Sequence, residues 1–282
     1  RGLDADAAGS EDEVLSHGGG LLATRSESTA LTSSGACCVR NCKSSALVSA
    51  TLRSMSGSRA RHRAAMEASI LEMGRVHLAR DGAAALSLRA VARDLGVASS
   101  AVYRYVDSRD ELLTRLIIDA FTALGDAVDA ALAEAPDGNR RFGIIAATVR
   151  AWGLTQPHLY ALIYGSPVPG YNAPGERTTE AGPRVVLRLL EDLADLAASP
   201  DGPEFPESEH AAAGRALETL LADPAVAAYD IPPALLSRAL AAWNLVLGAI
   251  TAEIFGQYGP GFVSDPEAHF SAIVTLADGL VL

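Results

Sequence analysis

Arginine is the residue type whose distribution in this chain points most clearly to a chemistry. Residues 59–118 carry 10 basic and 7 acidic residues, a net charge of +3, and all ten basic residues are arginines. A guanidinium group binds phosphate, and it can also donate two hydrogen bonds to the edge of a guanine base. The whole chain has 282 residues and a net charge of −11. A basic segment within an acidic chain indicates a localised binding site for a polyanion.

The remaining reactive residue types do not form a recognisable catalytic pattern. Lys43 is the only lysine, which excludes sites that need a lysine in a folded domain, such as a P-loop or a Schiff base. His-Glu-x-x-His, Gly-x-Ser-x-Gly and Gly-x-Gly-x-x-Gly are absent, the six histidines are scattered, and Ser166 has no evident triad. The sequence therefore predicts no enzyme, no catalytic residues, no metal site and no cofactor.

The first 58 residues differ from the rest of the chain. Residues 1–58 contain 12 serines, 7 glycines and all three cysteines, without sustained apolar periodicity. Such a segment buries too little apolar surface to offset its chain entropy, so we expect 1–58 to be a disordered tail. We hypothesise that it is upstream or non-native sequence and that translation begins near Met55. Cys37, Cys38 and Cys42 are then adventitious thiols, although they could bind a soft metal.

The pattern of residues 59–282 predicts helices. No proline occurs from residue 59 to 135, and apolar residues recur with helical spacing. This predicts helices over 61–80 and 88–95, a third from Ser99, and a long fourth opened by a capping box at Ser108 and Glu111. Ser87 is the expected N-cap of the second helix and Gly96 its left-handed stop. Further helices are expected at 139–155, 157–164, 176–197, 207–222, 233–258 and 267–281.

The predicted fold is therefore all-α, with three parts after the tail. Residues 59–106 form a three-helix, helix-turn-helix DNA-binding domain, 107–135 a connecting helix, and 136–282 a helical ligand-binding and dimerisation domain. A bare helix-turn-helix is also found in ordinary three-helix bundles. The basic block and the small polar residues that open the third helix favour DNA, because side chains there must reach base edges.

One segment resembles a known family. The run LSLRAVARDLGVASSAVYRYVDSRDELL, residues 86–113, is similar to the N-terminal signature of the TetR family of bacterial transcriptional regulators. The resemblance is detailed over residues 60–118. Residues 151–165, AWGLTQPHLYALIYG, followed by PVPGY at 167–171, look like one C-terminal domain subtype of this family, the Trp/His-Pro-type ligand-binding subtype.

The resemblance implies a set of DNA contacts. The third helix would enter the major groove with Ser99, Ser100 and Ala101 against the bases. Tyr103 would donate to a phosphate, and Arg104 and Tyr105 would contact backbone or bases. Arg89 matches a position from which family members reach a base, although it could also be a solvated surface arginine. Three arginines of the preceding arm could clamp phosphates or simply begin a soluble helix: Arg59, Arg61 and Arg63.

Two positions depart from the family pattern. Val106 stands where phenylalanine is usual, so we expect slightly looser packing there. His77 stands at a core position that is usually leucine. We interpret it as a neutral histidine packed and hydrogen-bonded in the core, with a pH switch as the alternative.

The C-terminal half is expected to pair two chains and to bind a small molecule. An apolar helix at 233–258, together with 207–222, could form a four-helix dimer interface, although some of these residues must serve the intramolecular core. Aromatic residues cluster in this acidic half, and they are interpreted either as core or as the lining of a ligand cavity. Residues 167–174 are the expected rim of that cavity. The candidate ligand-binding residues are Trp152, Tyr160, Tyr164, Tyr171 and Trp243.

The resulting functional hypothesis is a cytoplasmic repressor. It would bind a palindromic operator in double-stranded DNA as a homodimer and be released by an unknown small-molecule effector. The longest uncharged apolar stretch, residues 239–252, is shorter than the roughly 18 to 20 residues of a bilayer span, so no membrane partner is expected. The alternative is a helical small-molecule-binding or interaction protein without DNA-binding activity, or an enzyme.

Overall fold

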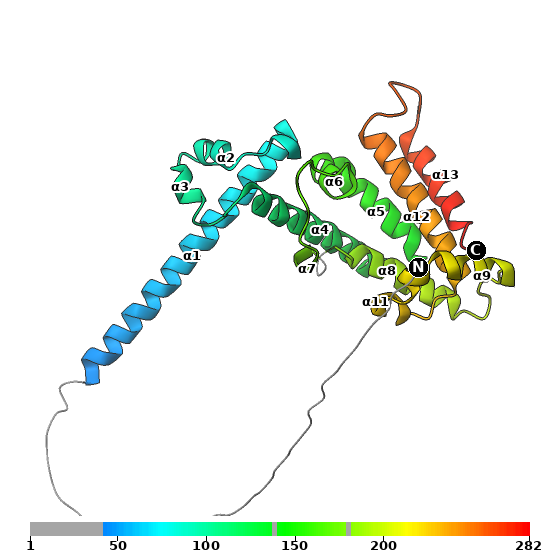
Figure 1. Cartoon of the computed structure of the whole chain (residues 1–282), viewed down its shortest axis with the longest axis horizontal. Helices are drawn as coiled ribbons and strands as arrows, with labels where there is room; N and C mark the ends of the chain where they lie inside the picture. Colours follow the sequence, from blue (N-terminus) through cyan, green and yellow to red (C-terminus); the bar gives the residue numbers. More distant parts are fainter. Residues whose placement is uncertain (1–41, 137–139, 179–181) are drawn as a thin grey trace, which may run out of the picture. The chain divides into compact units, whose positions relative to one another are not determined.

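The computed structural model describes residues 42–136, 140–178 and 182–282, and these residues form helices and loops without a strand (Figure 1). Residues 1–41 of the expected disordered tail, with Cys37 and Cys38, lie outside the described residues. The chain divides into two compact units, 1–53 and 54–282. The all-α prediction is confirmed.

The N-terminal helices follow the prediction with one difference at the start. Helix α1 spans Cys42–Asp81, so it begins well before the expected start at residue 61 and includes residues 42–58 of the expected tail. This segment contains no proline, and a helix that is already nucleated extends at low cost. A 3-10 turn, η1, at Ala83–Ala85 leads to α2 at Leu88–Asp94, α3 at Ser99–Val102 and α4 at Arg109–Ala133.

The C-terminal helices are more broken than the sequence suggested. The expected helix at 207–222 divides at Leu217, whose backbone leaves the helical region (φ −111°, ψ 17°). The expected helix at 176–197 becomes two, with Pro183 at the N-cap of the second. The helix expected to reach residue 258 ends at Ile254, because Gly256 has a φ of +65°. The elements are α5 Arg141–Thr155, α6 Pro157–Tyr164, α7 Gly175–Thr178, α8 Arg184–Ala197, α9 Glu207–Ala216, α10 Glu218–Leu221, α11 Pro224–Ala227, α12 Pro233–Ile254 and α13 Pro266–Asp278.

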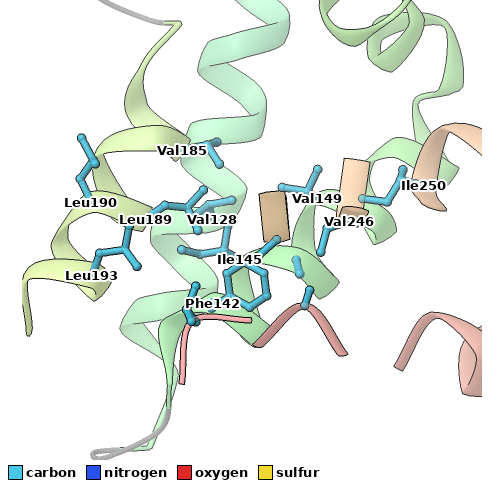
Figure 2. Close-up of a cluster of buried hydrophobic side chains, with 14 of the residues drawn as sticks. Val128, Phe142, Ile145, Val149, Val185, Leu189, Leu190, Leu193, Val246 and Ile250 are labelled. Atoms are coloured by element: carbon cyan, nitrogen blue, oxygen red, sulfur yellow. The ribbon is translucent and has the colours of Figure 1, made fainter. Parts of the chain in front are cut away.

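Two large clusters of buried side chains hold the second unit together. We call residues 59–106 the head and residues 136–282 the body. The head cluster joins α1, α2, α3 and the start of α4 through residues such as Ile70, Val91, Val102 and Leu116. The body cluster joins the end of α4 to α5, α8, α12 and α13. In Figure 2, the labelled side chains of this cluster meet from several helices: Val128, Phe142, Ile145, Val149, Val185, Leu189, Leu190, Leu193, Val246 and Ile250.

Helix α12 has the length and apolar composition of a membrane span, although its uncharged stretch at 239–252 is too short for one. In the fold it is an inner helix of the body. Its buried residues pack in the body cluster, among them Leu235, Val246 and Ile250. A mostly apolar core helix passes the same composition test as a bilayer span, so its packing explains its sequence.

Candidate nucleic-acid interface

The turn between α2 and α3 is a Schellman motif centred on Gly96. Gly96 has a φ of +68°, the left-handed conformation that glycine adopts without a steric penalty. Its N–H donates to the carbonyl oxygen of Arg93, and the N–H of Val97 donates to that of Ala92, both at 3.0 Å. The predicted stop at Gly96 is therefore confirmed. Ser87 is the N-cap residue of α2, as expected, but its side chain makes no capping hydrogen bond.

Helix α3 begins at Ser99, as expected, and anchors itself through one apolar side. Val102 and Val106 are fully buried in the head cluster. On the other side, Ser100, Tyr103 and Arg104 are exposed. Valine in place of the usual phenylalanine at position 106 thus still leaves a residue that is closed off from solvent.

The predicted DNA contacts differ in exposure. Arg89 on α2 is exposed, whereas Ser99 and Ala101 are half-buried. Tyr105 packs against the head cluster, and the guanidinium carbon of Arg63 lies 5.7 Å from the centroid of its ring. Tyr105 therefore contributes to the core as well as to the surface.

Two guanidinium groups on and near α2 and α3 are free to bind DNA. In the described part of the chain, Arg89 and Arg104 form no ion pair with an acidic side chain. Arg93 differs, because its Nε donates to Asp94 at 3.3 Å. An unpaired, exposed guanidinium loses no internal partner when it binds a phosphate or a base.

His77 joins α1 to the end of α2. The residue is 1% exposed, and its Nε2 lies 2.8 Å from Oδ2 of Asp94. The prediction of a packed, hydrogen-bonded core histidine is confirmed. Burial opposes ionisation of Asp94, but hydrogen bonds from His77 and Arg93 outweigh it and hold the pKa of Asp94 below its ordinary value. Asp94 was missed from the sequence, because nothing in the spacing of 17 residues between the two indicates the contact.

Side chains of α4 tie the head to the body. The Ser108 hydroxyl accepts a hydrogen bond from the Glu111 N–H at 3.0 Å, as the predicted capping box requires. In a complete capping box the Glu111 carboxylate would also accept from the N–H of Ser108. Here it pairs with Arg115 and with Arg177 of α7, and the hydrogen bond from Arg177 is the main cause of its lowered pKa. Thr114 Oγ1 lies 2.9 Å from the hydroxyl of Tyr171, in the loop after α6.

The five candidate ligand-binding residues do not surround one cavity. Trp152 lines a hollow between α1, α4 and α6, and Trp243 lines a separate cavity of only about 20 Å³. Tyr160 is fully buried, with its hydroxyl 3.1 Å from Thr251 Oγ1. Tyr164 lies beside Tyr160, with ring centroids 5.1 Å apart, and burial raises its pKa. Together with Tyr171 on the head cluster, these positions favour the interpretation as core for the tyrosines.

Both halves of the chain match TetR-family domains. Residues 70–116 match the family model for bacterial regulatory proteins of the tetR family. Residues 144–277 match the model for the tetracyclin repressor-like C-terminal domain. HTH-type transcriptional regulators of Mycobacterium bovis and Mycobacterium tuberculosis are each 42% identical over 224 residues, covering 77% of this chain and 92% of theirs.

Solved structures show the same architecture. The crystal structure of a regulatory protein with 32% identity matches with a TM-score of 0.64 and covers 78% of this chain and 98% of that one. A protein from Rhodococcus with 24% identity shares the fold, with a TM-score of 0.54 and coverage of 76% and 93%. With the helix-turn-helix geometry around Gly96, these matches show that the chain belongs to the TetR family of bacterial transcriptional regulators.

Proposed function

We propose that this protein is a cytoplasmic repressor that binds a palindromic operator as a homodimer and leaves it when a small molecule binds the body. Residues 59–106 are the DNA-binding domain, 107–135 the connecting helix, and 136–282 the ligand-binding and dimerisation domain. The observation that carries the proposal is the exposed surface of α2 and α3. The unpaired Arg89 is exposed on α2. Ser100 of α3 is exposed as well, and so are Tyr103 and Arg104 directly after it.

The roles at this surface follow from side-chain chemistry. Arg89 has the planar donor pair that reads a guanine in the major groove. Ser99, Ser100 and Ala101 are small, so they let the start of α3 approach the base edges. Tyr103 contacts a phosphate, which adds affinity without sequence preference, and Arg104 contacts the DNA backbone or a base. Tyr105 touches the backbone with its hydroxyl edge while its ring stays packed against the head.

An uncharged face on α12 and α13 supports dimerisation. Between Arg238 and Glu253, α12 has no charged residue, and its exposed positions include Leu240 and Leu245. The exposed side of α13 adds Leu276, 67% exposed, and small residues such as Ala272. Residues 119–282 otherwise carry a net charge of −13, so a neutral apolar face there fits a second copy of the same surface.

In this proposal α13, rather than residues 207–222, lies beside α12 in the dimer interface. The exposed surface of α9 and α10 carries charges, including Glu207 and Arg215, and one side of α9 is already bound to α12. The Arg238 guanidinium, for example, donates to both carboxylate oxygens of Glu209. Desolvating such charges costs free energy that an apolar face does not lose.

Selection of bound sequences from random duplex DNA tests the proposal. We expect an enriched palindrome whose half-sites are one helical turn apart, about 34–36 Å, because a two-fold dimer presents two copies of α3. Sedimentation of the same sample should show a dimer. Recovery of no preferred duplex at modest ionic strength would contradict operator binding and would favour a helical interaction protein instead.

A further inference from the structure

Two adjoining hollows lie where α1, α4 and α6 meet, and His158 lines both. The first has a volume of about 460 Å³, and the second about 330 Å³. Ligand pockets usually measure about 300 to 1,000 Å³. Their walls come from α1 and η1 of the head and from α4, α5, α6 and the following loop, so an occupant would touch both head and body.

The first hollow, which we call the polar hollow, has an excess of negative charge. Arg75 donates to Asp119 Oδ2 at 2.6 Å and to Glu72 Oε2 at 2.6 Å. Two carboxylates thus face one guanidinium, which leaves a net charge of −1. The indole of Trp152 lines the same hollow, and an aromatic face attracts a cation. A cationic group is therefore favoured here over an anion.

His158 does not cancel this negative charge at neutral pH. Burial lowers the pKa of His158, and the nearby positive charge of Arg75 lowers it further. The imidazole is therefore neutral at pH 7 and offers hydrogen bonding without repelling a cation. Gln156 adds an amide to the same wall.

The second hollow, which we call the apolar hollow, suits a hydrocarbon group. Leu78 of α1 and Ala161 and Leu162 of α6 line it, and Val168 and two prolines of the loop after α6 close another side. None of its lining residues except His158 carries a titratable side chain. Burial of a ligand's methylene groups there is favourable, because it removes apolar surface from water.

We propose that the two hollows form one binding site for an amphipathic organic monocation. The ammonium group lies beside Asp119 and Trp152, and the hydrocarbon part extends past His158 into the apolar hollow. The role of this ligand as the effector rests on the proposed function. Because the site is bounded by α1 on one side and α6 on the other, its occupation favours one arrangement of head and body over another.

The chain provides its own reporter of this site. It contains two tryptophans, so a Trp243→Phe variant leaves Trp152 as the only one. This variant is titrated with octylammonium, octanol and octanoate, which share a chain length and differ in charge. We expect octylammonium to change the Trp152 emission with a dissociation constant at least tenfold below that of octanoate. Equal affinity for octanoate, or no change with any probe, would overturn the proposal.

Substitutions separate the two hollows. Asp119→Asn removes one negative charge and should weaken octylammonium binding at least fivefold while leaving octanol unchanged. Glu134→Gln, an exposed position at the end of α4, makes the same charge change away from the site and should have no effect. Ala161→Phe should reduce binding of octylammonium and octanol together. Circular dichroism checks folding, and if Asp119→Asn is unfolded, the exposed Glu72→Gln replaces it; unchanged affinity in the folded charge variant would overturn the cation assignment.

Operator binding with and without saturating octylammonium tests the role as effector. We expect operator affinity to change at least tenfold in the natural chain and to stay constant in Ala161→Phe. Unchanged affinity in the natural chain would overturn the effector role. Failure to bind any duplex even without octylammonium would instead contradict the proposed function, and the Trp152 titration would still decide whether the cation site exists.

Discussion

Tyr171 and Thr114 are joined by a hydrogen bond of 2.9 Å between their hydroxyl oxygens. Thr114 belongs to α4 and is buried, and Tyr171 lies in the loop after α6, so the bond fixes that loop to the helix that leaves the head. The hydrogen bond therefore joins a loop of the body to the first turns of α4.

Tyr171→Phe removes this hydrogen bond and keeps the ring. We expect the free energy of unfolding to fall by about 1 kcal/mol, because a buried hydroxyl on Thr114 loses one partner. Denaturant unfolding measures the change. Thr114→Val, which removes the hydroxyl on the other side, should cost a similar amount, and the double variant should cost less than the sum. Additive effects would show that the two hydroxyls do not interact.

Gly96→Ala places a side chain at a φ of +68°. We expect a loss of about 1 to 2 kcal/mol, because residues with a Cβ are strained in the left-handed region. Gly214→Ala is the matched control: it lies in α9 with open space around its Cα and should stabilise the protein by about 0.5 to 1 kcal/mol. Thermal unfolding of the two variants should therefore shift in opposite directions.

Glu111→Gln should make the free energy of unfolding less dependent on pH in the acid range. The hydrogen bond from Arg177, aided by Arg115, holds the pKa of Glu111 below its unfolded value of 4.5. Stability from ionised Glu111 is therefore fully present above pH 4.5 and is lost as pH falls through the lower, folded pKa. The melting temperatures of the natural chain and Glu111→Gln should differ at pH 7 and converge in strong acid. A constant difference across this range would contradict the assignment.

Arg89→Ala and Tyr103→Phe should affect DNA binding in different ways. Loss of a bidentate arginine should reduce discrimination at one base pair by about 1 to 3 kcal/mol. Tyr103→Phe should weaken binding to all duplexes alike, since a phosphate contact carries no sequence information. Competition assays with the operator and its single-base variants distinguish the two patterns. If both variants bind as the natural chain does, the assignment of α2 and α3 to the groove is wrong.

Leu245→Arg tests the dimer face. A charge at the centre of an apolar interface is left without a partner, so we expect a monomer by sedimentation and a large loss of operator affinity. Ala211→Arg, at an exposed position of α9, makes the same change outside the proposed face and should leave the dimer intact. Dissociation by the α9 variant and not by Leu245→Arg would return the interface to the 207–222 segment.

Local signals made the head predictable. Ser87, Gly96 and Ser108 mark helix ends through their own backbone preferences, which act within a few residues. His77 was recognisable as an unusual core residue from its position on the apolar side of α1. Its partner Asp94, like the pairing of Thr114 with Tyr171, depends on how distant elements pack, and no local preference encodes that.

The body was harder to predict for the same reason. The break at Leu217 has no glycine or proline to mark it, and the early start of α1 has no local signal either. The aromatic residues were grouped by composition, but the fold uses Tyr160 and Tyr164 as core and places Trp152 at a hollow of about 460 Å³. The acidic pair Glu72 and Asp119 was missed, because the two residues lie on different helices.

Helix α4 contributes to both clusters, with Leu116 in the head cluster and Val128 in the body cluster. It contains no proline, and its one glycine, Gly125, is covered by the Arg184 side chain, so nothing along it serves as a joint. Twelve residues of α-helix span about 18 Å, and a tilt of about 5° at one end moves the other by more than an ångström. Helix α4 would therefore transmit a tilt as one rigid element. A small displacement of the side chains in one cluster would move the other cluster by more than an ångström.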